Sequence, residues 1–130
     1  MKIIIPMSGY GERFRNVGYD VPKPLIQVNK YKIIEHVVRM FSDSDEFIFV
    51  CNKDHLDNAK WGMEKILRDS CSKCEIVGIE PHKLGPVYAV LKAKHLIEKS
   101  EPLVVNYCDF SCYWNWNEFK KFVKDGSFDG

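Results

Sequence analysis

Two glycines and an arginine follow the first apolar run of the chain, in the stretch PMSGYGERF at residues 6–14. Gly9 and Gly11 let backbone N–H groups approach an anion closely, and glycine also tolerates a positive φ angle. Arg13 adds a cation, and Lys23 stands between two prolines that stiffen its backbone. These residue types suit a loop that holds a phosphate group. The alternative is a surface loop whose cations are solvated.

Known phosphate-binding motifs match this loop only in part. The third glycine of a dinucleotide fingerprint is replaced by Phe14, and no G-K-[ST] follows, as a Walker A loop requires. We also expect no helix to open directly after the loop. A dinucleotide-dependent oxidoreductase is therefore disfavoured.

Two acidic residues come at the ends of later apolar runs. Asp109 ends PLVVNYCDF, where its carboxylate suits Mg²⁺, although aspartate also occurs there as a turn or cap residue. Glu80 ends CEIVGIE, and an ionised glutamate only accepts hydrogen bonds. Glu80 therefore either accepts hydrogen bonds from a ligand or ends the strand in solvent.

The elements that must position these residues alternate along the chain. Apolar runs predict strands at 2–7, 45–51, 74–80 and 102–108. Helical periodicity predicts helices at 32–41, 54–69, 85–99 and 116–125. Residues 8–31 are predicted to form a long loop. This order predicts an α/β fold, a three-layer Rossmann-like sandwich with a mainly parallel sheet, in which ligands bind at the carboxyl ends of the strands.

Composition narrows the class of protein. The chain has 130 residues and a net charge of +1, which predicts one domain and suggests neither nucleic-acid nor membrane binding. We expect a cytoplasmic protein, because no signal-like or membrane-spanning run is present. The five cysteines are interpreted as reduced thiols, with Cys108 and Cys112 beside a strand end that could make them reactive.

The motifs together resemble a known family. G-x-G-x-R-F, P-K-P-L, PHKLGPVYAV and VNYCDF are similar to segments of the sugar-1-phosphate nucleotidyltransferases, over essentially the whole chain. These segments closely resemble a branch of the family found among bacterial capsule-biosynthesis proteins. The enzymes of this branch include some that use non-sugar acceptors such as phosphoglutamine, as in CTP:phosphoglutamine cytidylyltransferase-like proteins. PMSG departs from the Leu-Ala-Ala-Gly common in the family, which matters little if backbone amides bind there.

The resemblance implies a reaction and a role for each matched residue. A nucleoside triphosphate and a phosphorylated acceptor give a nucleotidyl-activated product and pyrophosphate. Arg13 and Lys23 are the implied catalytic cations, and Asp109 is the implied ligand of Mg²⁺. The residues implied to bind the nucleotide are Met7, Ser8, Gly9, Gly11, Glu80 and Gly85.

The base and the acceptor remain open at this point. Glu80 favours an amino-bearing base edge, so CTP is preferred and GTP is second. His82 lies in the base-reading segment, and it is the only histidine that we consider for a role in the site. The aromatic residues after Asp109 fill either an acceptor pocket or the edge of the core; they are Tyr113, Trp114 and Trp116.

The family usually continues beyond the equivalent of Gly130, with an acceptor-binding half that carries a second metal-binding Asp. Residues 1–130 are therefore expected to be the nucleotide-binding part of a nucleotidyltransferase domain, with the acceptor-binding half absent. We expect weak or no turnover from this chain alone, with retained binding of nucleotide and Mg²⁺. An open sheet edge would favour a homo-oligomer. The alternative function is a non-catalytic nucleotide-binding module.

Overall fold

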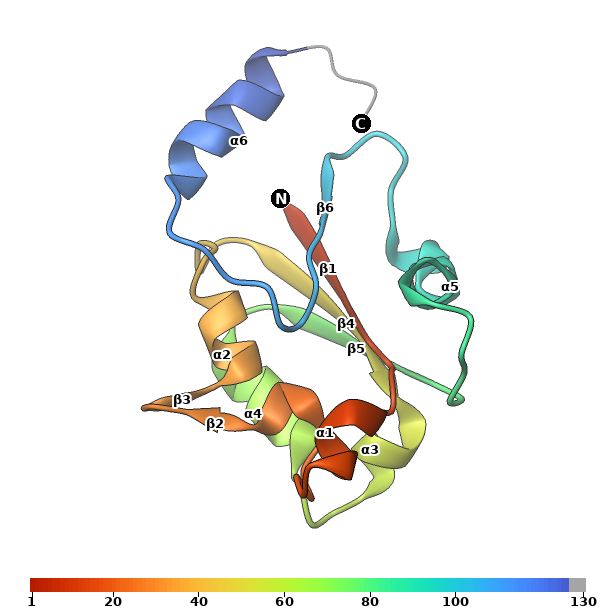
Figure 1. Cartoon of the computed structure of the whole chain (residues 1–130). Coiled ribbons are helices and arrows are strands. Elements are labelled where there is room, and N and C mark those ends of the chain that lie inside the picture. The colour runs from red at the N-terminus through yellow and green to blue at the C-terminus, as the bar shows by residue number, and fades with distance from the viewer. Residues whose placement is uncertain (127–130) are drawn as a thin grey trace.

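The computed structural model describes residues 1–126, and its centre is a four-stranded parallel sheet (Figure 1). The strand order is β5-β4-β1-β6, and each neighbouring pair is parallel. The strands are β1 (Lys2–Met7), β4 (Glu46–Asn52), β5 (Cys74–Ile79) and β6 (Leu103–Val105). Their carboxyl ends therefore meet at one edge of the sheet.

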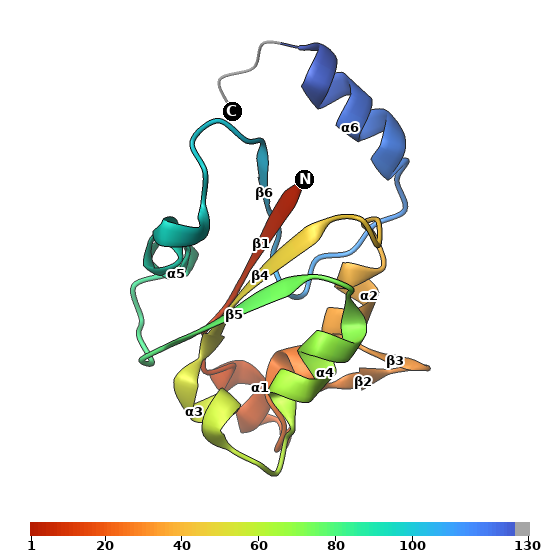
Figure 2. The ribbon, with the colours of Figure 1, turned by 180° about the vertical axis from the view of Figure 1, so that it is seen from behind.

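Helices cover both faces of this sheet, and this explains the continuous apolar strands. Helices α2 (Ile33–Val38) and α4 (Met63–Ser70) cover one face, and α5 (Pro86–Lys92) covers the other (Figures 1 and 2). The first core contains Ile3 and Ile5 with Met63 and Leu67; the second contains Ile4, Ile48, Val50, Ala89 and Ala93. Alternate residues of β1 thus enter different cores, and the predicted three-layer α/β sandwich is confirmed.

Four predicted elements differ in extent by more than one residue. The helix expected at 32–41 is α2, which ends at Val38. The helix expected at 54–69 is two helices, α3 (Lys53–Asp57) and α4, because Gly62 adopts a left-handed conformation with φ 56° at the start of α4. The helix expected at 85–99 ends with α5 and continues only as the 3-10 turn η2 (Lys94–Leu96). The strand expected at 102–108 stops at Val105, because the Asn106 amide turns the chain by donating to the carbonyls of Tyr107 and Phe110.

The segment 8–31 contains short elements rather than an irregular loop. They are α1 (Glu12–Asn16), η1 (Lys23–Leu25), β2 (Gln27–Val28) and β3 (Tyr31–Lys32). The expectation that no helix opens directly after the glycines was wrong. Gly11 has φ 66°, and its carbonyl accepts the N–H groups of Phe14 and Arg15, so α1 starts at once.

The opposite end of the sheet carries helix α6 (Trp116–Asp125) (Figure 1). Its Trp116 is buried and donates from Nε1 to Asp45 at 2.6 Å, so the core interpretation holds for this residue. Tyr113, by contrast, is fully exposed. In residues 1–126, no helix has the length and apolar character needed to cross a membrane.

Candidate functional site

A cleft of about 380 Å³ opens at the carboxyl ends of the strands. Seven of the nine predicted site residues line it, although they come from three separate parts of the sequence. They are Met7, Ser8, Gly9, Gly11, Arg13, Lys23 and Gly85. Prolines and two residues after β6 complete the wall: Pro6, Pro24, Pro86, Tyr107 and Cys108, together with His82.

The glycines of the cleft differ in what they do. Gly11 and Gly85 have φ angles of 66° and 82°, which side-chain-bearing residues rarely adopt. Gly11 starts α1, and Gly85 precedes α5, whose first residue is Pro86. Gly9 has ordinary φ, and a Cβ there would meet no atom within 4 Å. Its side-chain position is thus open, and a side chain there would occupy space beside the cleft.

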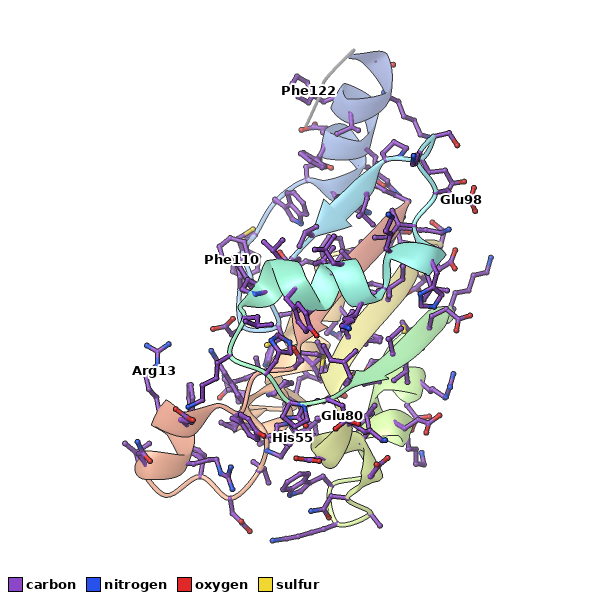
Figure 3. All side chains as sticks on the ribbon, turned by 90° about the vertical axis from the view of Figure 1, so that its right-hand side faces the viewer. Arg13, His55, Glu80, Glu98, Phe110 and Phe122 are labelled. Atoms are coloured by element: carbon purple, nitrogen blue, oxygen red, sulfur yellow. The ribbon has the colours of Figure 1, made fainter. Side chains whose placement is uncertain are left out.

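Lys23 links the cleft to its neighbours. Its ammonium forms an ion pair with Asp109 and lies 5.1 Å from the centre of the Phe14 ring. Lys23 also lines an adjoining hollow of about 280 Å³, where Arg13 adds a second cation and Lys83 a third, which pairs with Glu12 at 3.2 Å. Figure 3 shows the Arg13 side chain projecting from α1 into open space. This group of cations suits an anionic ligand, and the ammonium lies where such a ligand can replace Asp109.

Asp109 does not line the 380 Å³ cleft but reaches it through Lys23. Its side chain is 42% exposed, so a ligand oxygen or cation can approach the carboxylate. Residues 1–126 contain no group of three or more His, Cys, Asp or Glu side chains that could hold a metal ion. Magnesium is often bound by one or two carboxylates, with phosphate and water oxygens completing its shell. Asp109 therefore fits a metal bound mainly by a ligand's phosphates.

Glu80 is the second predicted residue outside the cleft lining. It follows β5, is exposed, and its carboxylate lies 3.3 Å from the Lys53 ammonium. Figure 3 shows it on the turn beneath α5, close to the sheet end. Only Oε1 of Glu80 pairs with Lys53, so Oε2 can accept from a ligand, and loss of the surface ion pair would cost at most about 1 kcal/mol.

Sequence reasoning gave no sign of how Ser8 and His82 meet. The Ser8 hydroxyl lies 2.9 Å from His82 Nε2, although the two residues are far apart in the sequence. Each follows a strand of the sheet, and that position is the only signal that could have suggested the contact. Cys108 has a different outcome: burial, helped by Asp109, raises the pKa of its thiol to about 12. This thiol stays protonated near neutral pH, which argues against the reactive role considered for it.

A larger hollow of about 760 Å³ lies at the amino end of the sheet, beside Met1, Asp45 and α6. Three lysines and three acidic side chains line it, and Lys120 lies 3.6 Å from the buried Asp45. Volume alone therefore does not identify the site. The carboxyl-end cleft combines glycine-rich backbone with cations, and we assign the candidate site there.

Known proteins share this fold. The structure resembles a nucleoside-diphosphate-sugar pyrophosphorylase from Vibrio cholerae, with 24% identity and a TM-score of 0.65, over 82% of this chain and 47% of that one. A UTP-bound UGPase from Acinetobacter baumannii gives 21% identity and a TM-score of 0.57, over 82% and 45% of the two chains.

Curated sequences give a consistent relationship. Mannose-1-phosphate guanyltransferases beta-B and beta-A of Xenopus laevis are each 25% identical to this chain over its whole length. The chain spans only 36% of the length of these two relatives. The sequence profile of the MobA-like NTP transferase domain matches residues 3–113, which is most of the chain. The chain therefore belongs to the MobA-like NTP transferase domain family.

Proposed function

We propose that this chain binds a nucleoside triphosphate and takes part in nucleotidyl transfer to a phosphorylated small molecule, with release of pyrophosphate. The observation that carries the proposal is the cleft itself. Residues from the first loop, the P-K-P segment and the start of α5 converge there, with Arg13 and Lys23 as cations. Family membership supports the same chemistry.

The proposed reaction depends on charge neutralisation and position. The acceptor phosphate attacks the α-phosphorus, both reactants are anions, and negative charge grows on the departing pyrophosphate. We assign Arg13 to the β- and γ-phosphates and Lys23 to the phosphates near the point of attack. The backbone amides of the glycine loop position the nucleotide. Mg²⁺, held by phosphate oxygens and Asp109, would supply further neutralisation of phosphate charge.

The Lys23–Asp109 pair gives the cleft a simple response to its ligand. Without phosphate, the two side chains neutralise each other at the cleft edge. With phosphate bound, the lysine can turn to the ligand, and the aspartate oxygens become available to a divalent cation. Because both side chains are partly exposed, this exchange costs little free energy.

We favour CTP as the nucleotide, with GTP second. Glu80 stands at the end of β5 and offers only acceptor oxygens, which suit the amino group of cytosine or the N1 and N2 edge of guanine. The two relatives named guanyltransferases support GTP as the alternative. Solved neighbours named for UTP and UDP-glucose make UTP a necessary comparison.

The acceptor is proposed to be a sugar 1-phosphate or a similar small phosphate ester, including phosphoglutamine. The sequence resemblance supports a role in making precursors of capsular or surface polysaccharide, in the cytoplasm. The relatives named for mannose 1-phosphate support a sugar-phosphate acceptor. The second candidate function is a nucleotide-binding module without turnover. We retain this candidate because the chain spans only 36% of the length of these relatives.

Isothermal titration of the chain with CTP, GTP, UTP, dTTP and ATP, each with Mg²⁺, tests the proposal. We expect the chain to bind nucleotides, and to bind CTP most tightly. The Glu80→Gln variant should lose the preference for CTP over UTP. Glu98→Gln is the matched control, because Glu98 also pairs with a lysine at 3.3 Å but lies at the other end of the sheet.

Pyrophosphate release in the presence of phosphorylated acceptors separates the two candidate functions. Release with a sugar phosphate supports the transferase. Because weak or no turnover is expected from residues 1–130 alone, binding without release supports the module only if a longer chain that includes an acceptor-binding half also releases no pyrophosphate. Absence of binding for all five nucleotides would contradict both.

A further inference from the structure

Ser8 and His82 bridge two loops of the cleft. Ser8 follows β1 and is only 4% exposed, and His82 follows β5. The distance from Ser8 Oγ to His82 Nε2 is 2.9 Å. Both residues line the 380 Å³ cleft, so their hydrogen-bonding pattern bears directly on any ligand there.

The second nitrogen of His82 decides which atom of this pair is the donor. The backbone N–H of Leu84 donates to His82 Nδ1 at 3.2 Å, so Nδ1 carries no hydrogen in this arrangement. A neutral imidazole then holds its hydrogen on Nε2. His82 therefore donates to Ser8, and the Ser8 oxygen accepts. An edge contact between His82 and Tyr88, with centroids 4.5 Å apart, holds the ring in place.

This assignment leaves the Ser8 hydrogen for another acceptor. A hydroxyl has one donor hydrogen and two lone pairs, so accepting from His82 leaves its own O–H available. Ser8, Gly85 and Pro86 line the cleft but not the adjoining cation-rich hollow. Although Arg13 and Lys23 also line this cleft, Ser8 lies outside the hollow that those two cations share, on the side that suits an uncharged part of a nucleotide such as its base.

We propose that His82 is a positioning residue that fixes the Ser8 hydroxyl as a donor to a carbonyl oxygen of the nucleobase, namely O2 of a pyrimidine. This inference rests on the proposed function. The Ser8 hydroxyl would be a side-chain donor in a part of the cleft where the proposed function otherwise uses backbone amides to position the nucleotide. Glu80, which follows β5 outside the cleft lining, would add an acceptor for the amino group, so that cytosine would meet one donor and one acceptor.

Two substitutions of His82 separate its possible roles. In His82→Asn, the short side chain can still accept from Leu84 N–H, as in an Asx turn, but cannot reach Ser8. In His82→Gln, the longer amide can place an N–H near the former Nε2 position. Ser8→Ala removes the hydroxyl, and His95→Asn, at an exposed histidine of η2, is the control.

Titration with CTP·Mg²⁺ and ATP·Mg²⁺ is the test, with thermal unfolding of every variant as a check on folding. We expect Ser8→Ala and His82→Asn to weaken CTP binding about fivefold relative to ATP binding, the usual size for one neutral hydrogen bond. His82→Gln should recover most of the CTP affinity. Equal losses for CTP and ATP, or no loss, would overturn the inference while leaving the proposed function intact.

The ring nitrogens of His82 give a readout that needs no nucleotide. In ¹⁵N-labelled protein at mildly alkaline pH, we expect Nε2 to be protonated and Nδ1 to be unprotonated. A hydrogen on Nδ1 overturns the inference alone. Wild-type protein that binds no nucleotide overturns both the inference and the function on which it rests.

Discussion

The two ends of the sheet each place an aspartate beside a cation, and they do so in opposite ways. At the amino end, Asp45 is 1% exposed and accepts from the Met1 amino group at 3.1 Å, from Ser42 N–H and from Trp116 Nε1. At the carboxyl end, Asp109 is 42% exposed, and the pairing cation is Lys23.

The difference lies in what remains for a ligand. The Asp45 oxygens are fully occupied by groups of the protein, and removing that carboxylate would leave buried donors unpaired. The pair of Asp109 and Lys23 is open to solvent and adjoins the cleft. The amino end therefore uses its charges for stability, and the carboxyl end leaves its charges accessible to the ligand that we propose.

Substitution of the two aspartates should give the largest contrast. Asp45→Asn is expected to lower the free energy of unfolding by about 3 kcal/mol, because a buried pair loses one charge. Asp109→Asn should lower it by less than about 1 kcal/mol, as for exposed pairs. Chemical denaturation measures both, with Asp69→Asn in the exposed pair with Lys65 as control. Similar losses at positions 45 and 109 would remove the contrast.

Removal of the cleft lysine should affect binding rather than stability. Lys23→Ala is expected to weaken nucleotide binding tenfold or more, since hydrogen bonds to charged groups contribute about 1.5–3 kcal/mol. Lys60→Ala is the matched control, because Lys60 also pairs with an aspartate, Asp20, but does not line the cleft. Titration of both variants with CTP·Mg²⁺ measures the effect, and equal affinities would exclude the role assigned to Lys23.

Two of the cleft glycines, Gly11 and Gly9, should differ in how much the fold depends on them. Gly11→Ala should destabilise the fold by about 1 kcal/mol, because its φ of 66° is strained for any side chain. Gly9→Ala should change stability by less than about 0.5 kcal/mol, because the added methyl group meets nothing within 4 Å. Denaturation curves test this order, and a larger loss for Gly9→Ala would contradict it.

Mild acid should give the smallest effect, which we expect through Asp45 at the amino end. Burial alone would raise the pKa of Asp45, but hydrogen bonds from Ser42, Trp116 and the Met1 amino group outweigh it and lower the pKa below 3.8. The stability from this shift is present above the unfolded pKa and is lost as pH falls through the folded one. Between pH 5 and 4 the loss should be well under about 1 kcal/mol, growing below pH 4. Asp45→Asn should flatten this part of the stability profile, and an unchanged profile would be inconsistent with the assignment.

The strands and layers were predictable because both faces of the sheet are buried. Continuous apolar runs such as KIIIPM have few alternatives in such a chain, and β1 lies where it was predicted. The grouping of cleft residues was also predictable, since parallel strands bring their carboxyl ends together. Helix α1 was missed, because its start depends on the left-handed conformation of Gly11.

Long-range polar contacts were not predictable. The Ser8–His82 bond and the Asp45–Trp116 bond join residues more than 70 positions apart, and no local pattern marks either one. Glu80 shows a related limit. The pattern placed it at a strand end, but not the direction of its side chain, which meets Lys53.

Chemical-shift mapping of the ¹⁵N-labelled chain with CTP·Mg²⁺ tests the central claim most directly. The account predicts the largest changes at the amides of residues 7–13, 82–85 and 109, and at Lys23, with little change at Asp45 or in α6. Changes concentrated around Asp45 and α6, beside the 760 Å³ hollow, or no changes at millimolar nucleotide, would contradict it.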